Sequence, residues 1–341
     1  MRSGRKRRAG WLVALGLILS ASSAAGNRLV VLQHRVWRVG SQGQIEPFAF
    51  AYPPWYDDNL QGSTLPSPSP DGRWIAFGRQ YDAYLLDVSS RQERRITKFG
   101  RAPHRRYVYV DVLIDGWSPD SSELLLAVGH GEDTSEEGDL LVPKAPFGFY
   151  VYNLTAGTTK PVALPKTFEY RAWLPDGRIL GVVPARVPGE GERLVTLRPG
   201  DARVVPVRVP IGALSHVQVS EDGKWMVGLL VGKRQPHKTA RIVKINLGTM
   251  SITLLASLGS WTGNERPAVS PHGEHFSYVR MTQMVKGIPQ EEIIVGERTL
   301  YSCPGPIDYR WVSGHTIALS CRNEVEVLDA PSGRALSSYG R

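Results

Sequence analysis

One short segment recurs along the chain, and this repetition restricts the possible folds more than any other feature. The segment from Pro68 to Phe77 (PSPDGRWIAF) contains a turn followed by an apolar strand. Asp suits such a turn because it bonds its own backbone two residues further on, and Gly because it adopts a positive φ without a steric clash. Five later segments resemble this one, and they begin at Trp117, Trp173, Val219, Val269 and Trp311.

The spacing of these segments predicts the architecture. Their markers Asp71, Asp120, Asp176, Asp222, His272 and Ser313 are 49, 56, 46, 50 and 41 residues apart. Repeats of about forty to fifty residues with several short strands are typical of β-propellers with four-stranded blades. One blade cannot bury its own faces, so the blades pack around a common axis. We therefore predict an all-β protein, a six-bladed β-propeller of four-stranded antiparallel blades.

A strand–turn–strand segment precedes the first repeat and leaves the blade number open. It has a strand from Leu29 to Val39, a turn from Gly40 to Gly43 and a second strand to Phe50. Within a single propeller domain, residues 26–341, we expect this hairpin (26–50) to take part in ring closure. Alternatively, it begins an incomplete seventh blade.

Residues 1–25 are predicted to be a secretory signal peptide. A basic leader precedes the apolar run from Trp11 to Leu19, and Ser23, Ala24 and Ala25 offer a cleavage site. The apolar run is short for a membrane span. Cleavage after Ala25 would remove five positive charges and lower the formal net charge from +9 to +4. We expect a periplasmic or secreted protein; the alternative is a membrane anchor formed by an uncleaved N-terminal segment.

The two cysteines, Cys303 and Cys321, are a possible disulfide in an exported protein. A bond between them would link the last repeat to the preceding blade. Two buried free thiols are the alternative, because the sequence does not supply the Cα separation that a disulfide requires. A metal site is not expected, because neither cysteine has a second ligand at suitable spacing.

The repeated Ser-Pro-Asp-Gly turn, followed by a basic residue and apolar residues, resembles the TolB-type, WD-repeat-like β-propeller family. The Arg- and Thr-rich segment from Arg94 to Thr97 adds to this resemblance, which extends over about residues 64–341. The turns are clear at Pro70, Pro119 and Pro175 and weaker later in the chain. The resemblance implies a six-bladed ring in the cell envelope. It implies no mechanism, because such repeats occur in binding proteins and in peptidases.

The connections between the expected strands differ in length on the two faces of the disc. Turns after the first and third strands are short, whereas long segments follow the second and fourth strands. Long loops on a rigid scaffold often carry binding residues, so we predict that this face, around the channel mouth, is the binding surface. Neutral variation in loop length is the alternative. The long segments are residues 51–65, 100–110, 129–148, 184–192, 232–239 and 280–290.

Two of the long segments supply the candidate binding residues. One contains an aromatic, proline-rich cluster that suits a protein hot spot, a peptide or a sugar ring. The other is a basic run that would attract acidic partners or lipid head groups. Packing over the rim and a solvated charged strand are the respective alternatives. The predicted partner-binding residues are Trp55, Tyr56, Arg101, His104, Arg105 and Arg106.

The sequence contains no recognisable catalytic motif. The segment from Gly259 to Gly263 has Ser at its second position and is not a nucleophile elbow, and there is no phosphate-binding loop or zinc motif. We therefore predict a non-catalytic exported propeller, a monomeric protein-binding scaffold in the cell envelope, without cofactor, metal or nucleic acid. The alternative is a small-ligand or saccharide binder, or a hydrolase or lyase with its site at the channel mouth.

Overall fold

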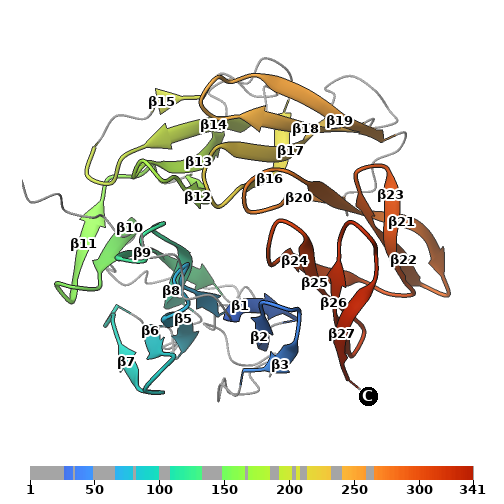
Figure 1. The fold of residues 1–341 in the computed structure, drawn as a ribbon. Coiled ribbons are helices and arrows are strands. Elements are labelled where there is room, and N and C mark those ends of the chain that lie inside the picture. The colour runs from blue at the N-terminus through green and yellow to red at the C-terminus, as the bar shows by residue number, and fades with distance from the viewer. Residues whose placement is uncertain are drawn as a thin grey trace, which may run out of the picture.

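The computed structural model describes residues 27–33, 35–48, 66–79, 82–99, 108–132, 148–165, 168–184, 192–201, 205–207, 213–231, 240–258 and 265–340. These residues form 27 β-strands in seven antiparallel sheets. The sheets stand around a common axis as the blades of a propeller (Figure 1). The prediction of six blades is therefore wrong, because residues 27–47 form a seventh sheet of three strands.

The blades are lettered A to G in chain order. Blade A contains β1 (Asn27–Leu32), β2 (Arg35–Gly40) and β3 (Ile45–Pro47). Blade B contains β4 (Ser67–Pro68), β5 (Trp74–Arg79), β6 (Asp82–Asp87) and β7 (Glu93–Arg95). Blade C contains β8 (Val108–Trp117), β9 (Glu123–Glu132), β10 (Gly148–Asn153) and β11 (Thr158–Val162). Blade D contains β12 (Glu169–Trp173), β13 (Ile179–Pro184), β14 (Glu192–Leu197) and β15 (Val205–Pro206).

The remaining three blades follow the same order of four strands. Blade E contains β16 (Ala213–Val219), β17 (Trp225–Val231), β18 (Ala240–Asn246) and β19 (Ile252–Leu258). Blade F contains β20 (Arg266–Val269), β21 (Phe276–Val285), β22 (Ile288–Val295) and β23 (Arg298–Cys303). Blade G contains β24 (Ile307–Trp311), β25 (Thr316–Cys321), β26 (Glu324–Asp329) and β27 (Ala335–Tyr339).

The recurring segments form the turns between the first and second strands of blades B to G. In blade B, Ser69 Oγ donates to Asp71 Oδ1 (2.6 Å) and accepts the N–H of Trp74 (3.0 Å). The turn therefore satisfies its own polar groups, which explains why this short motif recurs. The same Ser–Asp bond is present in blades C and E, between Ser118 and Asp120 and between Ser220 and Asp222.

These turns also contact the neighbouring blade. Gly223, in the turn of blade E, has a φ of +64°, and a Cβ there would lie 2.0 Å from Cδ of Pro175 in blade D. Gly273 in blade F has a φ of +80°, and a Cβ there would lie 2.1 Å from Cδ1 of Trp225 in blade E. Glycine at these two positions permits both the backbone conformation and the close approach of the preceding blade.

Blade A differs from the other blades in the direction of its strands. The guanidinium of Arg28, at the start of β1, donates to the carbonyl of Val312, just after β24 (2.5 Å). The N–H of Gln33, just after β1, donates to Asp308 Oδ2 near the start of β24 (2.9 Å). β1 therefore runs antiparallel to β24. By direction, β1 to β3 correspond to the second to fourth strands of the other blades, and no described strand corresponds to their first.

The ring closes by packing between blades G and A, without exchange of strands. β27 pairs with β26 and β1 pairs with β2, so among the described residues the N-terminal hairpin does not pair with the last blade. A shared apolar cluster joins the two sheets. It consists of Val30, Leu32, Trp37 and Val39 from blade A and Val312, Ala318, Val325 and Val327 from blade G.

The connections between strands lie on two sides of the disc. The side with the recurring turns is called the turn side, and the opposite side, where one blade is linked to the next, is called the link side. Connections on the turn side are short, as from Pro68 to Trp74. The link side includes the connections from Pro47 to Ser67, from Arg95 to Val108 and from Glu132 to Gly148.

One segment predicted as a long loop, residues 280–290, is instead the end of a β-hairpin. β21 continues to Val285 and β22 begins at Ile288, so the strands reach almost to the turn. Lys286 and Gly287 form the turn with φ values of 52° and 79°. Two consecutive positive φ angles are typical of the two-residue turn that matches the twist of a hairpin.

Candidate functional site

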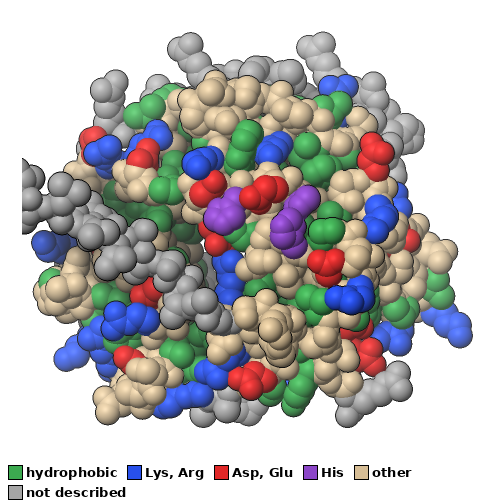
Figure 2. All heavy atoms as spheres, viewed as in Figure 1, with side chains coloured by type: hydrophobic (Ala, Val, Ile, Leu, Met, Phe, Trp, Pro, Cys, Tyr) green, Lys and Arg blue, Asp and Glu red, His purple; other side chains and the backbone are tan. Residues whose placement is uncertain are grey.

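The first strands of blades B to G, together with β1, surround the centre of the disc (Figure 1). In β24, the buried side chains of Ile307, Tyr309 and Trp311 alternate with the more exposed side chains of Asp308 and Arg310. Because side chains alternate across a strand, the buried set fills the layer between blades and the other set faces the channel. Figure 2 shows basic, acidic and His side chains gathered around the hollow at the centre.

Blades D and G carry the same triplet, an acidic residue, Tyr and Arg, in their first strands. In β12, Arg171 donates to Glu169 Oε2 (2.7 Å) and to the carbonyl of the intervening Tyr (3.1 Å). In β24, Arg310 donates to Asp308 Oδ1 (3.0 Å) and to the carbonyl of the intervening Tyr (2.7 Å). Each arginine is therefore held against its own strand, and a carboxylate two residues earlier balances its charge.

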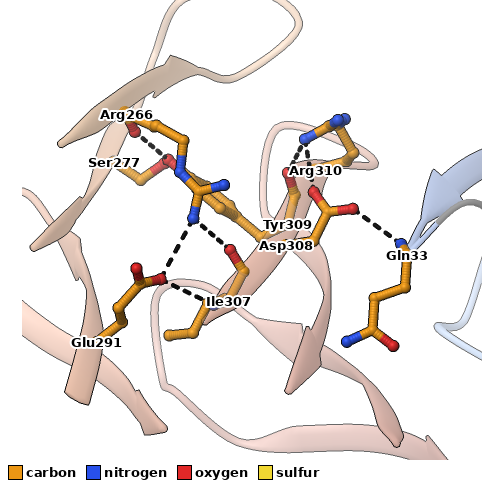
Figure 3. A network of polar contacts seen from close by, with 8 residues as sticks. All are labelled: Gln33, Arg266, Ser277, Glu291, Ile307, Asp308, Tyr309 and Arg310. Atoms are coloured by element: carbon orange, nitrogen blue, oxygen red, sulfur yellow. Dashed lines mark hydrogen bonds and ion pairs between the residues drawn. The ribbon is translucent and has the colours of Figure 1, made fainter. Parts of the chain in front are cut away.

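A third arginine is held by both blade F and blade G. Arg266 Nη2 donates to the carbonyl of Ile307 (2.5 Å) and to Glu291 Oε2 (3.2 Å), and the same carboxylate oxygen accepts the N–H of Ile307 (2.8 Å) (Figure 3). Tyr309 lies behind this group, and its hydroxyl donates to the carbonyl of Arg266 (3.0 Å). Burial raises the pKa of Tyr309 to about 12, so this hydroxyl keeps its proton at neutral pH.

A fourth arginine reaches across the channel on the turn side. Arg28 of blade A donates to the carbonyl of Val312 in blade G (2.5 Å) and pairs with Glu221 in the turn of blade E. Blades E and A are not neighbours in the ring, so this side chain crosses the channel mouth. Burial lowers the pKa of Arg28 from its usual value.

These four arginines share one arrangement. Each donates to a backbone carbonyl and pairs with one carboxylate, so the described channel wall is close to charge balance at these positions. A guanidinium that is fixed in this way is preorganised and loses little side-chain entropy on binding a ligand. The pairs are Arg28–Glu221, Arg171–Glu169, Arg266–Glu291 and Arg310–Asp308.

One carboxyl group near the channel has a different environment. Asp115 lies where the register between β8 and β9 shifts between Ile114 and Gly116. Burial raises the pKa of Asp115 to about 7, and in the described part of the chain its carboxyl group has no hydrogen-bond partner. Tyr170 packs against this bulge, because a Cβ on Gly116 would lie 2.2 Å from its hydroxyl oxygen. Burial and the nearby Asp115 raise the pKa of Tyr170.

The six residues predicted to bind a partner are not among those that the structure describes. Trp55 and Tyr56 belong to residues 49–65, and the basic residues belong to residues 100–107, so all six lie outside the described residues. They therefore remain predictions. The channel residues were not selected from the sequence, although the repeated acid–Tyr–Arg triplet at residues 169–171 and 308–310 was a visible signal.

The two cysteines lie at the seam between blades F and G. Cys303, at the end of β23, and Cys321, at the end of β25, form a disulfide with their Cα atoms 6.1 Å apart. The bond joins the outer strand of one blade to the second strand of the next, so it covalently links the two blades.

The described residues contain no group of three or more His, Cys, Asp or Glu side chains that could hold a metal ion. They also contain no helix with the length and apolar character needed to span a membrane.

No family model matches the chain, and no curated protein matches its sequence. Among solved structures, the fold is similar to oligogalacturonate lyase from Vibrio parahaemolyticus (TM-score 0.53, 10% identity, covering 84% of this chain and 80% of that one). It is also similar to dipeptidyl peptidase 4 from Porphyromonas gingivalis (TM-score 0.50, 14% identity, 92% of this chain and 50% of that one).

TolB β-propellers are among the structural neighbours, at low sequence identity. The comparison with TolB from Acinetobacter baumannii gives a TM-score of 0.49 and 15% identity and covers 81% of this chain. The match spans 62% of the length of that TolB. At these identities the comparisons show the fold alone.

Proposed function

We propose that this chain is a non-catalytic, exported β-propeller that binds a protein partner in the cell envelope. The partner docks on the link side, around the mouth of the channel. The main support is the distribution of the connections, because the turn side has short connections and the link side has the long ones. A rigid ring with long connections on one side is a common arrangement for a binding surface.

The chemistry of the channel wall agrees with a binding role. A catalytic site requires a nucleophile, base or acid that is free to react with a substrate. The four channel arginines are instead paired with carboxylates and held by backbone carbonyls. Arg266, at the start of β20 on the link side, can orient a polar partner there, because a fixed fork of N–H donors favours carboxylates.

Partner capture from envelope extract tests this proposal. The variant combines Trp55→Ala, Tyr56→Ala and Arg105→Ala, and its matched control on the turn side combines Arg73→Ala and Arg334→Ala. We expect the link-side variant to lose the partner recovered with the wild-type chain, while the control retains it. Equal recovery with both variants would reject the link side as the docking surface. Circular dichroism of both variants checks that the fold is retained.

A second candidate function rests on Asp115. A carboxyl group with a pKa of about 7 and no hydrogen-bond partner in the described part of the chain can take up or release a proton near neutral pH. This property would suit a small-ligand or saccharide binder, or a hydrolase or lyase with its site at the channel mouth.

The pH dependence of stability tests the state of Asp115. Its folded pKa of about 7 lies above the usual value of 3.8, so folding becomes less favourable as pH rises from about 4 to about 7. We expect Asp115→Asn to gain melting temperature relative to wild type across this interval, with no further gain above it. A constant difference between pH 4 and 8 would contradict the raised pKa.

Thermal-shift screening of neutral and acidic oligosaccharides tests the ligand itself. A shift of the melting temperature that is lost in Asp115→Asn would support this candidate.

A further inference from the structure

The end of the β21–β22 hairpin exposes an unusual concentration of apolar side chains. Of the seven large hydrophobic residues that are exposed in the described structure, three lie within this one tip. Met284 is 56% exposed, Val285 is 43% exposed and Ile288 is 46% exposed. Single exposed apolar residues are ordinary, but such a cluster indicates a contact surface.

This part of the hairpin has no support from the rest of its blade. β20 pairs with β21 only as far as Val279, and β23 pairs with β22 only from Glu291 onward. Beyond these points the two strands pair only with each other, as in the pairs Val285–Ile288 and Met284–Pro289. Four residues at the end of β21 (282–285) and three at the start of β22 (288–290) therefore extend beyond both outer strands, a length of roughly 10–13 Å. The hairpin lies at the right-hand margin of the ring in Figure 1, and Figure 2 shows apolar and basic side chains at that margin.

The tip carries a single charge, which is positive. Between residues 281 and 290 the only charged residue is Lys286, in the turn itself. Lys286 has no ion pair among the described residues, whereas Arg280 at the base of the tip is paired with Glu292 (2.7 Å). The tip therefore combines three apolar side chains with one free ammonium group.

From these observations we propose that the tip inserts into the head-group layer of an anionic lipid membrane. Met284, Val285 and Ile288 enter the boundary between head groups and acyl chains, and Lys286 contacts lipid phosphates. Burial of apolar side chains together with attraction of a cation to anionic lipids is how peripheral proteins bind such surfaces. The tip connects the second and third strands of blade F and therefore lies on the link side, but its contact with lipid is distinct from the docking of a protein partner around the channel mouth.

The size of the tip favours a membrane over a protein. A specific protein interface buries roughly 800 Å² on each partner. Three half-exposed side chains at the end of a narrow ribbon fall far short of that area, and the same argument applies to a second copy of this chain. A bilayer needs no shaped complement, so a small protruding tip is sufficient for a weak, reversible contact.

Vesicle sedimentation tests the proposal. The protein is the chain from Gly26 onward, which retains all seven described sheets and removes the apolar N-terminal run. The probes are vesicles of phosphatidylglycerol with phosphatidylethanolamine, and vesicles of phosphatidylcholine alone. We expect binding to the anionic vesicles to fall roughly tenfold or more when Met284, Val285 and Ile288 are all replaced by Ser. The matched control, Val205→Ser with Leu254→Ser, removes two equally exposed apolar side chains elsewhere and is expected to bind like wild type.

Two further measurements decide the outcome. With Met284→Cys labelled by an environment-sensitive dye, we expect a blue shift on anionic vesicles, and Lys286→Glu should weaken binding to them. Unchanged binding of the triple Ser variant, or no dye shift, would overturn the proposal. Light scattering that shows a dimer in wild type and a monomer in the triple Ser variant, without vesicle binding, would overturn it in favour of a second copy. Unchanged melting temperatures of all variants exclude loss of the fold.

Discussion

Blade G contacts blade F on one side and blade A on the other, and the two seams are built differently. At the F–G seam, Arg266 and Ile307, the first residues of β20 and β24, are hydrogen-bonded to each other, and the Cys303–Cys321 disulfide joins the sheets. Buried polar bonds continue inward, because Trp311 Nε1 donates to Ser277 Oγ (2.9 Å). This seam therefore combines apolar packing with directional and covalent links.

The G–A seam depends mainly on apolar packing. Trp37 is buried, lies in the shared cluster and meets the ring of Tyr339 edge-on with centroids 5.1 Å apart. Its polar contacts are exposed or only partly buried: the N–H of Gln33 donates to Asp308, Arg28 to the carbonyl of Val312, and the Ser337 hydroxyl to the carbonyl of Gly43. The physical reason is the direction of β1, which is opposite to that of β24 and so prevents the start-to-start contacts of the F–G seam. The two seams show that a blade whose innermost strand runs in the opposite direction can still complete the ring. Apolar packing then takes the place of the polar contacts found at the F–G seam.

Removing the side chain of Trp37 is expected to weaken the G–A seam most. Trp37→Ala should lower the free energy of unfolding by about 3–5 kcal/mol, because it leaves a cavity in the shared cluster. Denaturant unfolding measures the loss, and hydrogen exchange should show faster exchange in β1, β2 and β27 than in blade F. In the described structure the indole N–H has no partner, so Trp37→Phe should cost much less. Uniform loss of protection in all blades would contradict a local seam.

Removing the disulfide should weaken the F–G seam by a smaller amount. The two cysteines are 18 residues apart in sequence, and a loop of this size corresponds to roughly 3 kcal/mol of stability through restriction of the unfolded chain. The double variant Cys303→Ala, Cys321→Ala is expected to show this loss in denaturant unfolding. Reduction of the wild-type chain should give a similar value. An unchanged midpoint in both experiments would mean that the bond contributes nothing to stability.

Tyr309→Phe tests the buried polar part of the F–G seam. The hydroxyl donates to the carbonyl of Arg266 and accepts a hydrogen bond from Ser277 Oγ (3.2 Å), and its removal leaves both groups less satisfied. We expect a loss of about 1–2 kcal/mol in the free energy of unfolding. Tyr339→Phe at the other seam is the control, because Tyr339 is 46% exposed, and its effect should stay below about 0.5 kcal/mol. Equal effects of the two variants would remove the proposed difference.

The smallest effect is expected from the ion pair that spans blades A and E. Glu221→Gln should cost about 0.5 kcal/mol, because the side chains of Arg28 and Glu221 are 37% and 54% exposed and solvent screens their attraction. The difference from wild type should shrink at high salt. Denaturant unfolding at low and high ionic strength measures both values. A loss as large as that of Trp37→Ala would show that blade A is held by charge across the channel as strongly as by its packing against blade G.

The number of blades was predicted from the recurring turn, and this signal identified six of the seven blades. The recurring turn joins the first and second strands, so it marked each of the six blades that have both strands. Blade A has no counterpart of the first strand among its described residues and therefore no such turn. Its turns, near Gln33 and between Gly40 and Gln44, do not resemble the motif. A count of motifs consequently missed one blade, and the six-bladed prediction followed.

The candidate site was less accessible to prediction than the fold. The triplets at residues 169–171 and 308–310 are legible in the sequence, but their role depends on which face of the strand is turned toward the axis. Pairing between distant residues, such as Arg28 with Glu221, has no local sequence signal. Residues 280–290 are expected as a long connection, and Gln283, Lys286 and Gly287 do interrupt the apolar pattern of the β21–β22 tip. Strand pairing across the hairpin overrides that local composition.

The direction of blade A also determines where the two ends of the described chain leave the disc. Asn27 begins β1 next to the turn side, whereas Tyr339 ends β27 at the link side. A circular permutant that joins residue 340 to residue 27 would need a linker that crosses the height of a blade, roughly 20 Å for a six-residue strand. An affinity tag placed before residue 27 would instead emerge on the turn side and leave the opposite surface free for capture experiments.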